Sequence, residues 1–450
     1  MTLPIRDEIF YPIFCFYPSI FPPANLNSHI ILFLAWNYNI KTNLSLYYKT
    51  FCHAFCFTLL IRKNLYLLEH MKTEQRIYSE GEGWVTKSDN SLGTLAQLVF
   101  LFGNRELLKQ QQPIDLIRET YPNAEIVGCS TSGEIYQEEV YNQNIVCTAV
   151  WFEKTKIEIV KEVVHSMDDS FSVGEKLASK LDKEHLVHIM VLSEGLNING
   201  SELTKGINKQ LNDRISITGG LAGDQDLFSE TVIVHNQAGE KNLVVAIGFY
   251  GENLRVGYGS MGGWDSFGVD REVTKSKANI LYELDGQPAL ELYKRYLGAH
   301  AANLPASALL FPLSLRLNNI ETPLVRTVLS VNEADGSMVF AGDIPQGEYV
   351  RLMKASSDRL IDGANDAAEM SKISLRDSDA DLAILISCVG RKLVLKQRVE
   401  EELEIIREVV GNKTAMTGFY SYGEISPTKP FDQHCELHNQ TMTITLFKEI

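Results

Sequence analysis

Three features of the sequence predict an α/β fold with mixed β-sheets and an internal repeat. The pattern Gly-x-x-[Ser/Thr]-x-Gly-Glu-Ile occurs twice, at residues 128–135 and 418–425. An apolar segment and a segment of helical spacing precede each copy, and another apolar segment follows it. This recurring order is an internal repeat, and its period is too long for a solenoid. We therefore expect two related halves that face each other, with helices outside the sheets.

The same elements are expected in both copies. In the first they are a strand at 98–102, a helix at 114–120 and a strand at 146–152; in the last they are a strand at 382–386, a helix at 399–410 and a strand at 442–447. A small loop and an arginine close the first strand of each copy, at Arg105 and Arg391. Strands separated by helices predict parallel pairs, and the closing strands are expected to be antiparallel.

A weaker third copy lies between these two. Its expected elements are a strand at 187–192, a helix at 202–211 and strands at 231–234 and 243–249. The turn at 218–224 keeps the glycines but lacks the Glu-Ile ending. A half-buried strand at 157–164 and a helix at 170–181 precede this copy.

The remaining segments are less regular. Residues 71–90 are polar, and Gly81 and Gly83 lead us to expect an irregular lead-in. Residues 257–262 match Gly-x-Gly-x-x-Gly, but the residues that follow do not start a helix, so we reject a dinucleotide site. A strand at 280–284, a helix at 288–297 and a hairpin of 325–331 with 337–341 are expected next.

Composition bounds the function. A chain of 450 residues can hold two or three domains. A formal charge of −15 argues against nucleic acid or an anionic membrane surface as the partner, because phosphate binding needs a basic face. Seven scattered cysteines suit free thiols in a reducing cytoplasm better than a disulfide framework. His434 and His438 are four residues apart, as in a helical metal pair, but they lie between Pro430 and a strand and lack companion ligands, so we expect a solvated loop there and no metal ion or cofactor.

The first seventy residues differ from the rest in composition. They are rich in aromatic residues and carry only Asp7, Glu8 and Glu69 as acids, whereas Met71 opens an ordinary polar start. Their apolar runs are shorter than the ~20 residues that cross a bilayer. We interpret residues 1–70 as a start-site extension that is disordered or non-native, and a membrane-associated segment is the alternative.

The repeated turns carry the candidate binding chemistry. A glycine-lined turn lets backbone N–H groups approach a ligand, and the hydroxyls of Ser130, Thr131 and Ser421 can donate and accept hydrogen bonds. Glu134 and Glu424 could receive an ammonium group, and Arg391 has the fork geometry for a carboxylate. A ligand with both charges, such as an amino acid, would fit. Alternatively, the hydroxyls and glutamates cap nearby backbone and Arg391 pairs with a local acid.

Cysteine and serine chemistry leaves other functions open. A guanidinium near Cys388 would favour its thiolate and make it a candidate redox sensor, although a buried inert cysteine is commoner. Cys129 or Ser130 could act as the nucleophile of a hydrolase, but neither turn spells Gly-x-Ser-x-Gly. A protein-interaction scaffold is a further alternative.

Five segments in order give the chain a resemblance to the FIST family, whose members pair a FIST N with a FIST C domain. These segments are residues 128–134, 218–224, 284–290, 388–391 and 418–425. The resemblance implies FIST N at 91–253, FIST C at 254–450, and an intracellular sensory module of bacterial signalling that binds small ligands without catalysis. We expect no attached signalling domain, so the output would pass through a separate partner protein. The predicted ligand-binding residues are Gly128, Ser130, Thr131, Glu134, Cys388, Gly390, Arg391, Gly418, Tyr420, Ser421 and Glu424.

Overall fold

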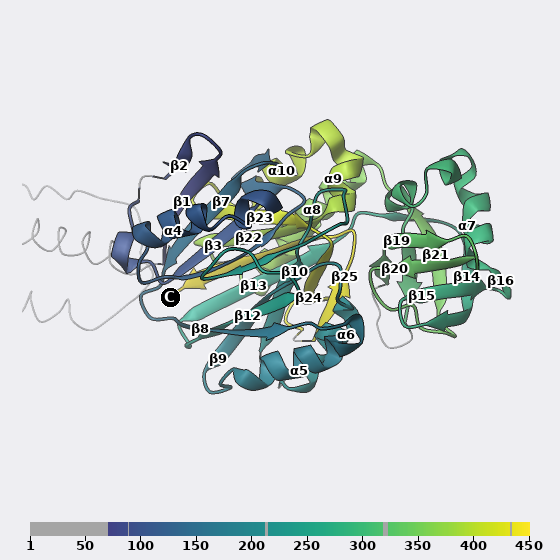
Figure 1. The fold of residues 1–450 in the computed structure, drawn as a ribbon, viewed down its shortest axis with the longest axis horizontal. Coiled ribbons are helices and arrows are strands. Elements are labelled where there is room, and N and C mark those ends of the chain that lie inside the picture. Colours follow the sequence, from purple (N-terminus) through teal and green to yellow (C-terminus); the bar gives the residue numbers. More distant parts are fainter. Residues whose placement is uncertain (1–70, 89, 212–214, 318–322, 433) are drawn as a thin grey trace, which may run out of the picture. The chain divides into compact units, whose positions relative to one another are not determined.

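The computed structural model describes residues 71–450 except 89, 212–214, 318–322 and 433 (Figure 1). The interpretation of residues 1–70 lies outside the described residues. The described chain forms three six-stranded sheets and one eight-stranded sheet, with helices beside them. The predicted class of mixed sheets covered by helices is confirmed.

Each six-stranded sheet is centred on one copy of the repeat. In the first copy, β3 (Leu98–Gly103) runs parallel to β4 (Glu125–Ser130) through helix α4 (Gln111–Thr120), and β7 (Ile145–Trp151) pairs antiparallel with β3. The second copy repeats this order with β9 (Leu186–Ser193), α6 (Gly200–Lys209), β10 (Ser216–Leu221) and β12 (Leu243–Tyr250). The third does so with β22 (Leu382–Cys388), α10 (Glu401–Val410), β23 (Ala415–Ser421) and β26 (Met442–Glu449). The expected parallel pairs and antiparallel closing strands are confirmed, and the weak copy is a full repeat.

An outer strand completes each repeat by pairing antiparallel with its closing strand. These strands are β1 (Lys72–Ser79), β8 (Lys156–Val163) and β13 (Leu254–Met261). The irregular lead-in predicted for residues 71–90 is therefore wrong, because β1 and β2 (Gly83–Thr86) form a hairpin there. Its polar residues hid the strand: Glu74 is buried, where its carboxylate accepts hydrogen bonds from Arg76 and from the Leu92 amide.

The three repeats exchange one strand each in a cycle. After its glycine turn, repeat one sends β5 (Glu134–Tyr136) to pair with β23 of repeat three. Repeat three sends β24 (Gly423–Pro427) to β10 of repeat two, and repeat two sends β11 (Ile233–His235) to β4 of repeat one. Short strands β6 (Glu139–Tyr141) and β25 (Cys435–His438) extend two of these sheets. No repeat can therefore complete its sheet alone.

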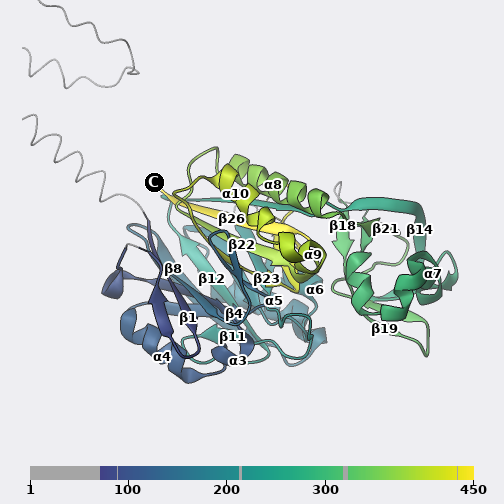
Figure 2. The same cartoon turned by 90° about the horizontal axis from the view of Figure 1, so that it is seen from above.

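The inner faces of the three sheets share one apolar core. Phe102, Leu192, Ile386 and Phe419 meet there, and the rings of Phe102 and Phe419 lie 4.8 Å apart. The outer faces are covered by helices (Figures 1 and 2): α4 lies on the first sheet, α5 (Ser170–Lys180) and α6 on the second, and α8 (Ser357–Ser374) and α10 on the third. On the third sheet, Gly257 and Gly259 of β13 let α8 approach closely, since a Cβ on either would lie 2.2–2.3 Å from an α8 carbonyl oxygen. This contact explains the glycine pattern that we rejected as a dinucleotide site.

An inserted domain interrupts the third repeat between β13 and α8. Its sheet has the order β18 (Leu324–Arg326), β17 (Leu313–Arg316), β21 (Tyr349–Lys354), β14 (Asp265–Lys277), β15 (Ile280–Leu284), β20 (Ser337–Phe340), β19 (Val328–Asn332), with β16 (Gln287–Pro288) beside β15. Helix α7 (Ala289–Leu297) packs on this sheet, followed by 3-10 turns η3 (Gly298–Asn303) and η4 (Ala306–Leu310). The hairpin of β19 and β20 and the helix after Pro288 agree with the sequence predictions.

Five short helical segments complete the described part of the three-repeat core. They are η1 (Gly93–Leu95), α3 (Arg105–Leu108) and α9 (Val389–Leu395), with 3-10 turns η2 (Met167–Asp169) and η5 (Lys396–Arg398) next to longer helices. Among the residues that the structure describes, no helix is both long and apolar enough to cross a membrane.

The close-approach glycine of the repeat is a steric requirement. A Cβ on Gly128, Gly219 or Gly418 would lie 1.8–2.0 Å from the carbonyl oxygen of the residue paired with it on the parallel strand, Leu101, Val191 or Leu385. We expect Gly128→Ala to lower the free energy of unfolding by about 3 kcal/mol or more, because this carbonyl belongs to a sheet that cannot move away. Urea unfolding measures the change.

Gly347→Ala is the matched control for that substitution. Gly347 has a φ of +88° and no atom within 4 Å of the added Cβ, so backbone strain alone should cost about 1–2 kcal/mol. Equal losses in the two variants would show that the close approach is not the cause.

Candidate functional site

The glycine turns of the three repeats meet in a ring of backbone hydrogen bonds. The Ser132 amide donates to the Tyr420 carbonyl at 2.7 Å, and the Tyr422 amide donates to the Leu221 carbonyl at 3.2 Å. The Gly223 amide donates to the Ser130 carbonyl at 2.9 Å and closes the cycle. Each donor lies four residues after its close-approach glycine and each acceptor two residues after the glycine of another repeat. We call segments 130–133, 221–223 and 420–423 the ring loops.

The predicted ligand-binding residues of the first turn bind within the protein. Gly128 lies in β4, and the Ser130 hydroxyl accepts the Val232 amide at 3.0 Å. The Thr131 hydroxyl donates to Glu134 Oε1 at 2.7 Å. Glu134 is buried with Oε2 unpartnered, and burial raises the pKa of its carboxyl to about 8.

The last turn is built in the same way. Gly418 lies in β23, and the Ser421 hydroxyl donates to Glu424 Oε1 at 2.5 Å. Glu424 Oε2 accepts the amide and hydroxyl of Thr441 at 3.1 and 2.9 Å. Burial raises the pKa of Glu424 to about 8 as well. Both glutamates thus accept hydrogen bonds from nearby protein groups, as expected if the turn residues cap the structure around them.

Arg391 has a protein partner at each guanidinium nitrogen. It is wholly buried, and its Nε and Nη2 lie 3.2 and 2.9 Å from Glu402 Oε2. Nη2 also donates to the Leu360 carbonyl at 2.7 Å, and Nη1 donates to the Gly262 carbonyl. Glu402 further accepts the hydroxyl of Tyr420 at 2.6 Å. This network fastens the last ring loop to the start of the inserted domain and to α8.

Cys388 and Gly390 flank the start of α9 and are also buried. A Cβ on Gly390 would meet the side-chain amide of Gln440. Burial raises the pKa of the Cys388 thiol well above its usual range, and Arg391 offsets this only slightly. The geometry therefore favours the inert alternative over a reactive thiolate. The thiols of Cys129, Cys147 and Cys435 are buried and have raised pKa values too.

Lys392 contacts the ring loops and was not singled out by the sequence analysis. Its ammonium donates to the Ser132 carbonyl at 2.5 Å and to the Asn142 side chain, and it lies 5.5 Å from the ring centroid of Tyr420. Burial lowers its pKa, while the charge of Glu134 acts in the opposite direction. Its position next to Arg391 in a Gly-Arg-Lys sequence was the available signal.

A cavity of about 660 Å³ lies beside the ring loops. It is lined by residues 226–228 after β10, by 393, 394 and 396 at the end of α9, and by 303–305, 309–310 and 328–329 of the inserted domain. Phe228 of this lining stacks on Tyr422 of the ring, with centroids 4.4 Å apart. None of the predicted ligand-binding residues is among the described residues that line it. We call it the ring-end cavity.

The ring-end cavity has the features of a small-molecule site. Ligand cavities in proteins are mostly apolar and of roughly 300–1,000 Å³, and in α/β folds they lie beyond the carboxyl ends of parallel strands. Here β10 and β22 end at the loops that form its wall, and most of the lining side chains are apolar. Asp226 and Lys396 are exposed charges of opposite sign among the lining residues.

The fold and the ring define a class of three-repeat α/β proteins with an inserted domain. Comparison with known sequences then gives the family: the chain matches the FIST N domain over residues 97–287 and the FIST C domain over 289–427. The protein belongs to the FIST family, whose domains are sensory and signal-transduction modules.

Individual relatives are distant. The uncharacterized protein MJ1623 of Methanocaldococcus jannaschii is 24% identical over 337 residues, which cover 70% of this chain and 64% of that protein. The chain thus spans less than two thirds of this relative's length. Among solved structures, cyanuric acid hydrolase from A. caulinodans aligns with a TM-score of 0.29 and 8% identity, over 80% of this chain and 91% of that chain. At such a score the likeness informs neither fold nor activity.

Removing Arg391 should destabilise the fold because it leaves Glu402 buried without its cation. We expect Arg391→Met to cost about 3–5 kcal/mol in urea unfolding. The double variant Arg391→Met/Glu402→Gln should recover much of this loss, since the neutral amide no longer needs a counter-charge. If the double variant is as unstable as the sum of both single variants, the two side chains are not coupled.

The buried Glu134 should give stability a pH dependence. Its folded pKa of about 8 lies above the usual value of 4.5, so the folded state holds a proton that the unfolded state loses as the pH rises between these values. Stability from this proton is therefore present below pH 4.5 and lost by about pH 8. We expect Glu134→Gln to gain at least about 1 kcal/mol over the wild type between pH 5 and 8.

The buried His188 and His438 have lowered pKa values, which make the stability rise with pH below 6.5. Both histidines are present in the wild type and in Glu134→Gln, so their contribution cancels when the two pH profiles are compared. Glu333→Gln, at an exposed carboxylate of the inserted domain, should leave the pH profile unchanged. A Glu134→Gln profile parallel to that of the wild type would mean that Glu134 is ionised throughout.

Proposed function

We propose that this protein senses a small metabolite in the ring-end cavity and passes the signal to a separate partner protein in the cytoplasm. The observation that carries the proposal is the composition of the cavity wall. The three-repeat core supplies the loop after β10 and the end of α9, and the inserted domain supplies η3, η4 and β19. A ligand that contacts both parts would bias their relative position, which is what a sensory module requires.

The lining favours an amphoteric ligand with an apolar body, such as an apolar amino acid. Leu304, Leu309 and Leu393 offer apolar contact for a side chain. Lys396 supplies a cation for a carboxylate, and Asp226 supplies an anion for an ammonium group. This retains the ligand class predicted from the sequence but moves its contacts from the turns to the cavity beside them.

Helix α9 connects the cavity to the ring loops. Leu393 and Val394 line the cavity, while the preceding residue, Lys392, binds the Ser132 carbonyl. Arg391, one residue earlier, binds the carbonyls of Gly262 and Leu360 at the joint with the inserted domain. A shift of α9 on ligand binding would therefore reach both the ring and the inserted domain.

A thermal-shift screen with the twenty amino acids tests this function. Binding at 100 times Kd stabilises by about 2.7 kcal/mol, so leucine or phenylalanine should raise Tm by several degrees while aspartate and lysine should not. We expect Leu329→Trp, which places an indole in the cavity, to abolish the shift.

Ser330→Trp is the matched control, because Ser330 is the exposed neighbour of Leu329 on β19. It should keep the wild-type response. The proposal fails if no amino acid changes the Tm of the wild type, as expected for an interaction scaffold, or if Leu329→Trp responds like the wild type.

A further inference from the structure

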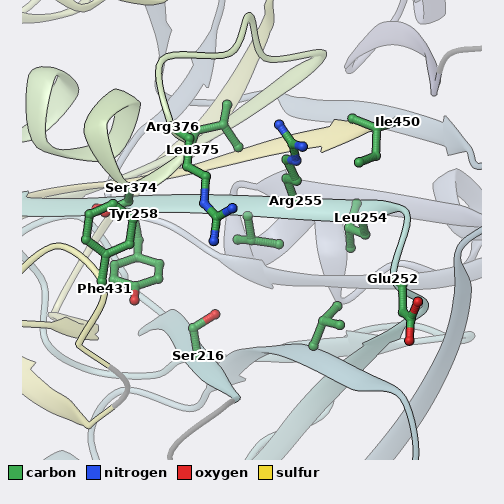
Figure 3. Close-up of a pocket in the computed structure, with 12 residues that line it drawn as sticks. Ser216, Glu252, Leu254, Arg255, Tyr258, Ser374, Leu375, Arg376, Phe431 and Ile450 are labelled. Atoms are coloured by element: carbon green, nitrogen blue, oxygen red, sulfur yellow. The ribbon is translucent and has the colours of Figure 1, made fainter.

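A second cavity lies at the opposite end of β10, beside the start of β9. It has a volume of about 430 Å³ and is lined by Val187 and Ser216 at the starts of β9 and β10, by residues of β13, and by the end of α8 (Figure 3). The ring loops follow the other ends of β10 and β23, so the two cavities are separate. We call it the strand-start cavity. Its ligand is independent of the function proposed for the ring-end cavity.

Two arginines give this cavity a cationic lining. Arg255 projects from β13, where its Nη1 lies 3.4 Å from the Ser378 hydroxyl, a weak contact for a guanidinium. Arg376 follows α8 with an exposed side chain, and Figure 3 shows its guanidinium reaching across β13 toward the side where Ser216 lies. Glu252 is the acidic side chain of the lining, and the figure shows it at the far end from Arg376. Anions are therefore favoured at the Arg376 end.

A buried hydrogen-bond chain ends at the Ser216 hydroxyl. The Thr445 hydroxyl donates to Thr218 Oγ1 at 2.8 Å, and Thr218 Oγ1 lies 3.0 Å from His188 Nε2. His188 Nδ1 lies 2.8 Å from Ser216 Oγ. His188 is wholly buried, and burial lowers its pKa to about 3, so the imidazole is neutral and one ring nitrogen donates while the other accepts.

The tautomer of His188 sets the direction of this chain, because the Thr218 hydroxyl can accept hydrogen bonds as well as donate one. In the tautomer with the proton on Nδ1, Thr218 Oγ1 accepts the Thr445 proton and donates its own to His188 Nε2, and Nδ1 donates to Ser216 Oγ. The Ser216 proton is then left without an acceptor in this chain and can point into the cavity. The cavity floor thus presents a hydrogen-bond donor on the same side as the cation.

We propose that the strand-start cavity binds a small oxyanion, the carboxylate or phosphate group of a metabolite, between the Arg376 guanidinium and the Ser216 hydroxyl. A guanidinium fork suits two oxygens of either group. Ser216 donates to a third oxygen or to the same one, with its proton directed by His188. Arg255 supplies a second positive charge, which favours ligands with more than one negative charge.

Isothermal titration with citrate and with inorganic phosphate tests this site on the full chain. We expect the wild type to bind at least one of the two with a Kd below about 1 mM. Arg376→Gln should weaken that binding about tenfold or more, and Ser216→Ala about threefold or more. Arg376 is exposed at the end of a helix, so its variant should fold even if Ser216→Ala does not.

The control is Arg295→Gln, which removes an exposed arginine of the inserted domain that binds Gln287. It should leave the Kd unchanged. Binding of citrate alone identifies a carboxylate ligand, and binding of phosphate alone identifies a phosphorylated one. The proposal is overturned if the wild type binds neither anion, or if Arg376→Gln binds as tightly as the wild type.

Discussion

Three backbone hydrogen bonds between the ring loops are the constraint on which this structure depends. Each bond joins a turn of one repeat to a turn of the next, and the last returns to the first. The exchanged strands β5, β11 and β24 begin beyond these turns, so each sheet receives its strand only when the cycle is closed. The shared apolar core lies behind the ring loops, around Phe102, Leu192 and Phe419. It excludes water, which would otherwise compete for the three hydrogen bonds of the ring. Ring, strand exchange and core are therefore expected to form together.

The sequence predicts the local elements because their signals are local. The close-approach glycine has the same neighbour in all three repeats, a carbonyl oxygen of the parallel strand. This steric requirement explains why the middle copy has the glycine although its turn lacks Glu-Ile. The closing strands and helices follow from apolar periodicity. Strand exchange has no such local signal. Strand β5 pairs with a strand almost three hundred residues away, and nothing in the sequence of β5 indicates which strand that is. Two facing halves are what the strongest motifs suggest; the third repeat appears as an equal only in the sheet topology.

The candidate site shows the same division between local and distant information. Motif residues bond within their own turns, Thr131 to Glu134 and Ser421 to Glu424, and Glu134 Oε2 is left without a partner. The partner of Arg391 is Glu402, one residue of an acidic run whose burial cannot be read from sequence. The cavity beside the ring is lined largely by ordinary leucines and valines from two parts of the fold, and no motif marks them. The ligand site that we propose thus lies next to the motifs, while the motif residues stabilise the scaffold.

Amide hydrogen exchange at the ring tests the central claim most directly. If the ring closes the fold, the amides of Ser132, Gly223 and Tyr422 have no route to exchange short of global unfolding. The structure predicts that the three amides share one opening free energy, equal to that of global unfolding by denaturant. If one of them exchanges through a smaller local opening while the core amides of β3, β9 and β22 stay protected, the three repeats are held together by something other than the ring.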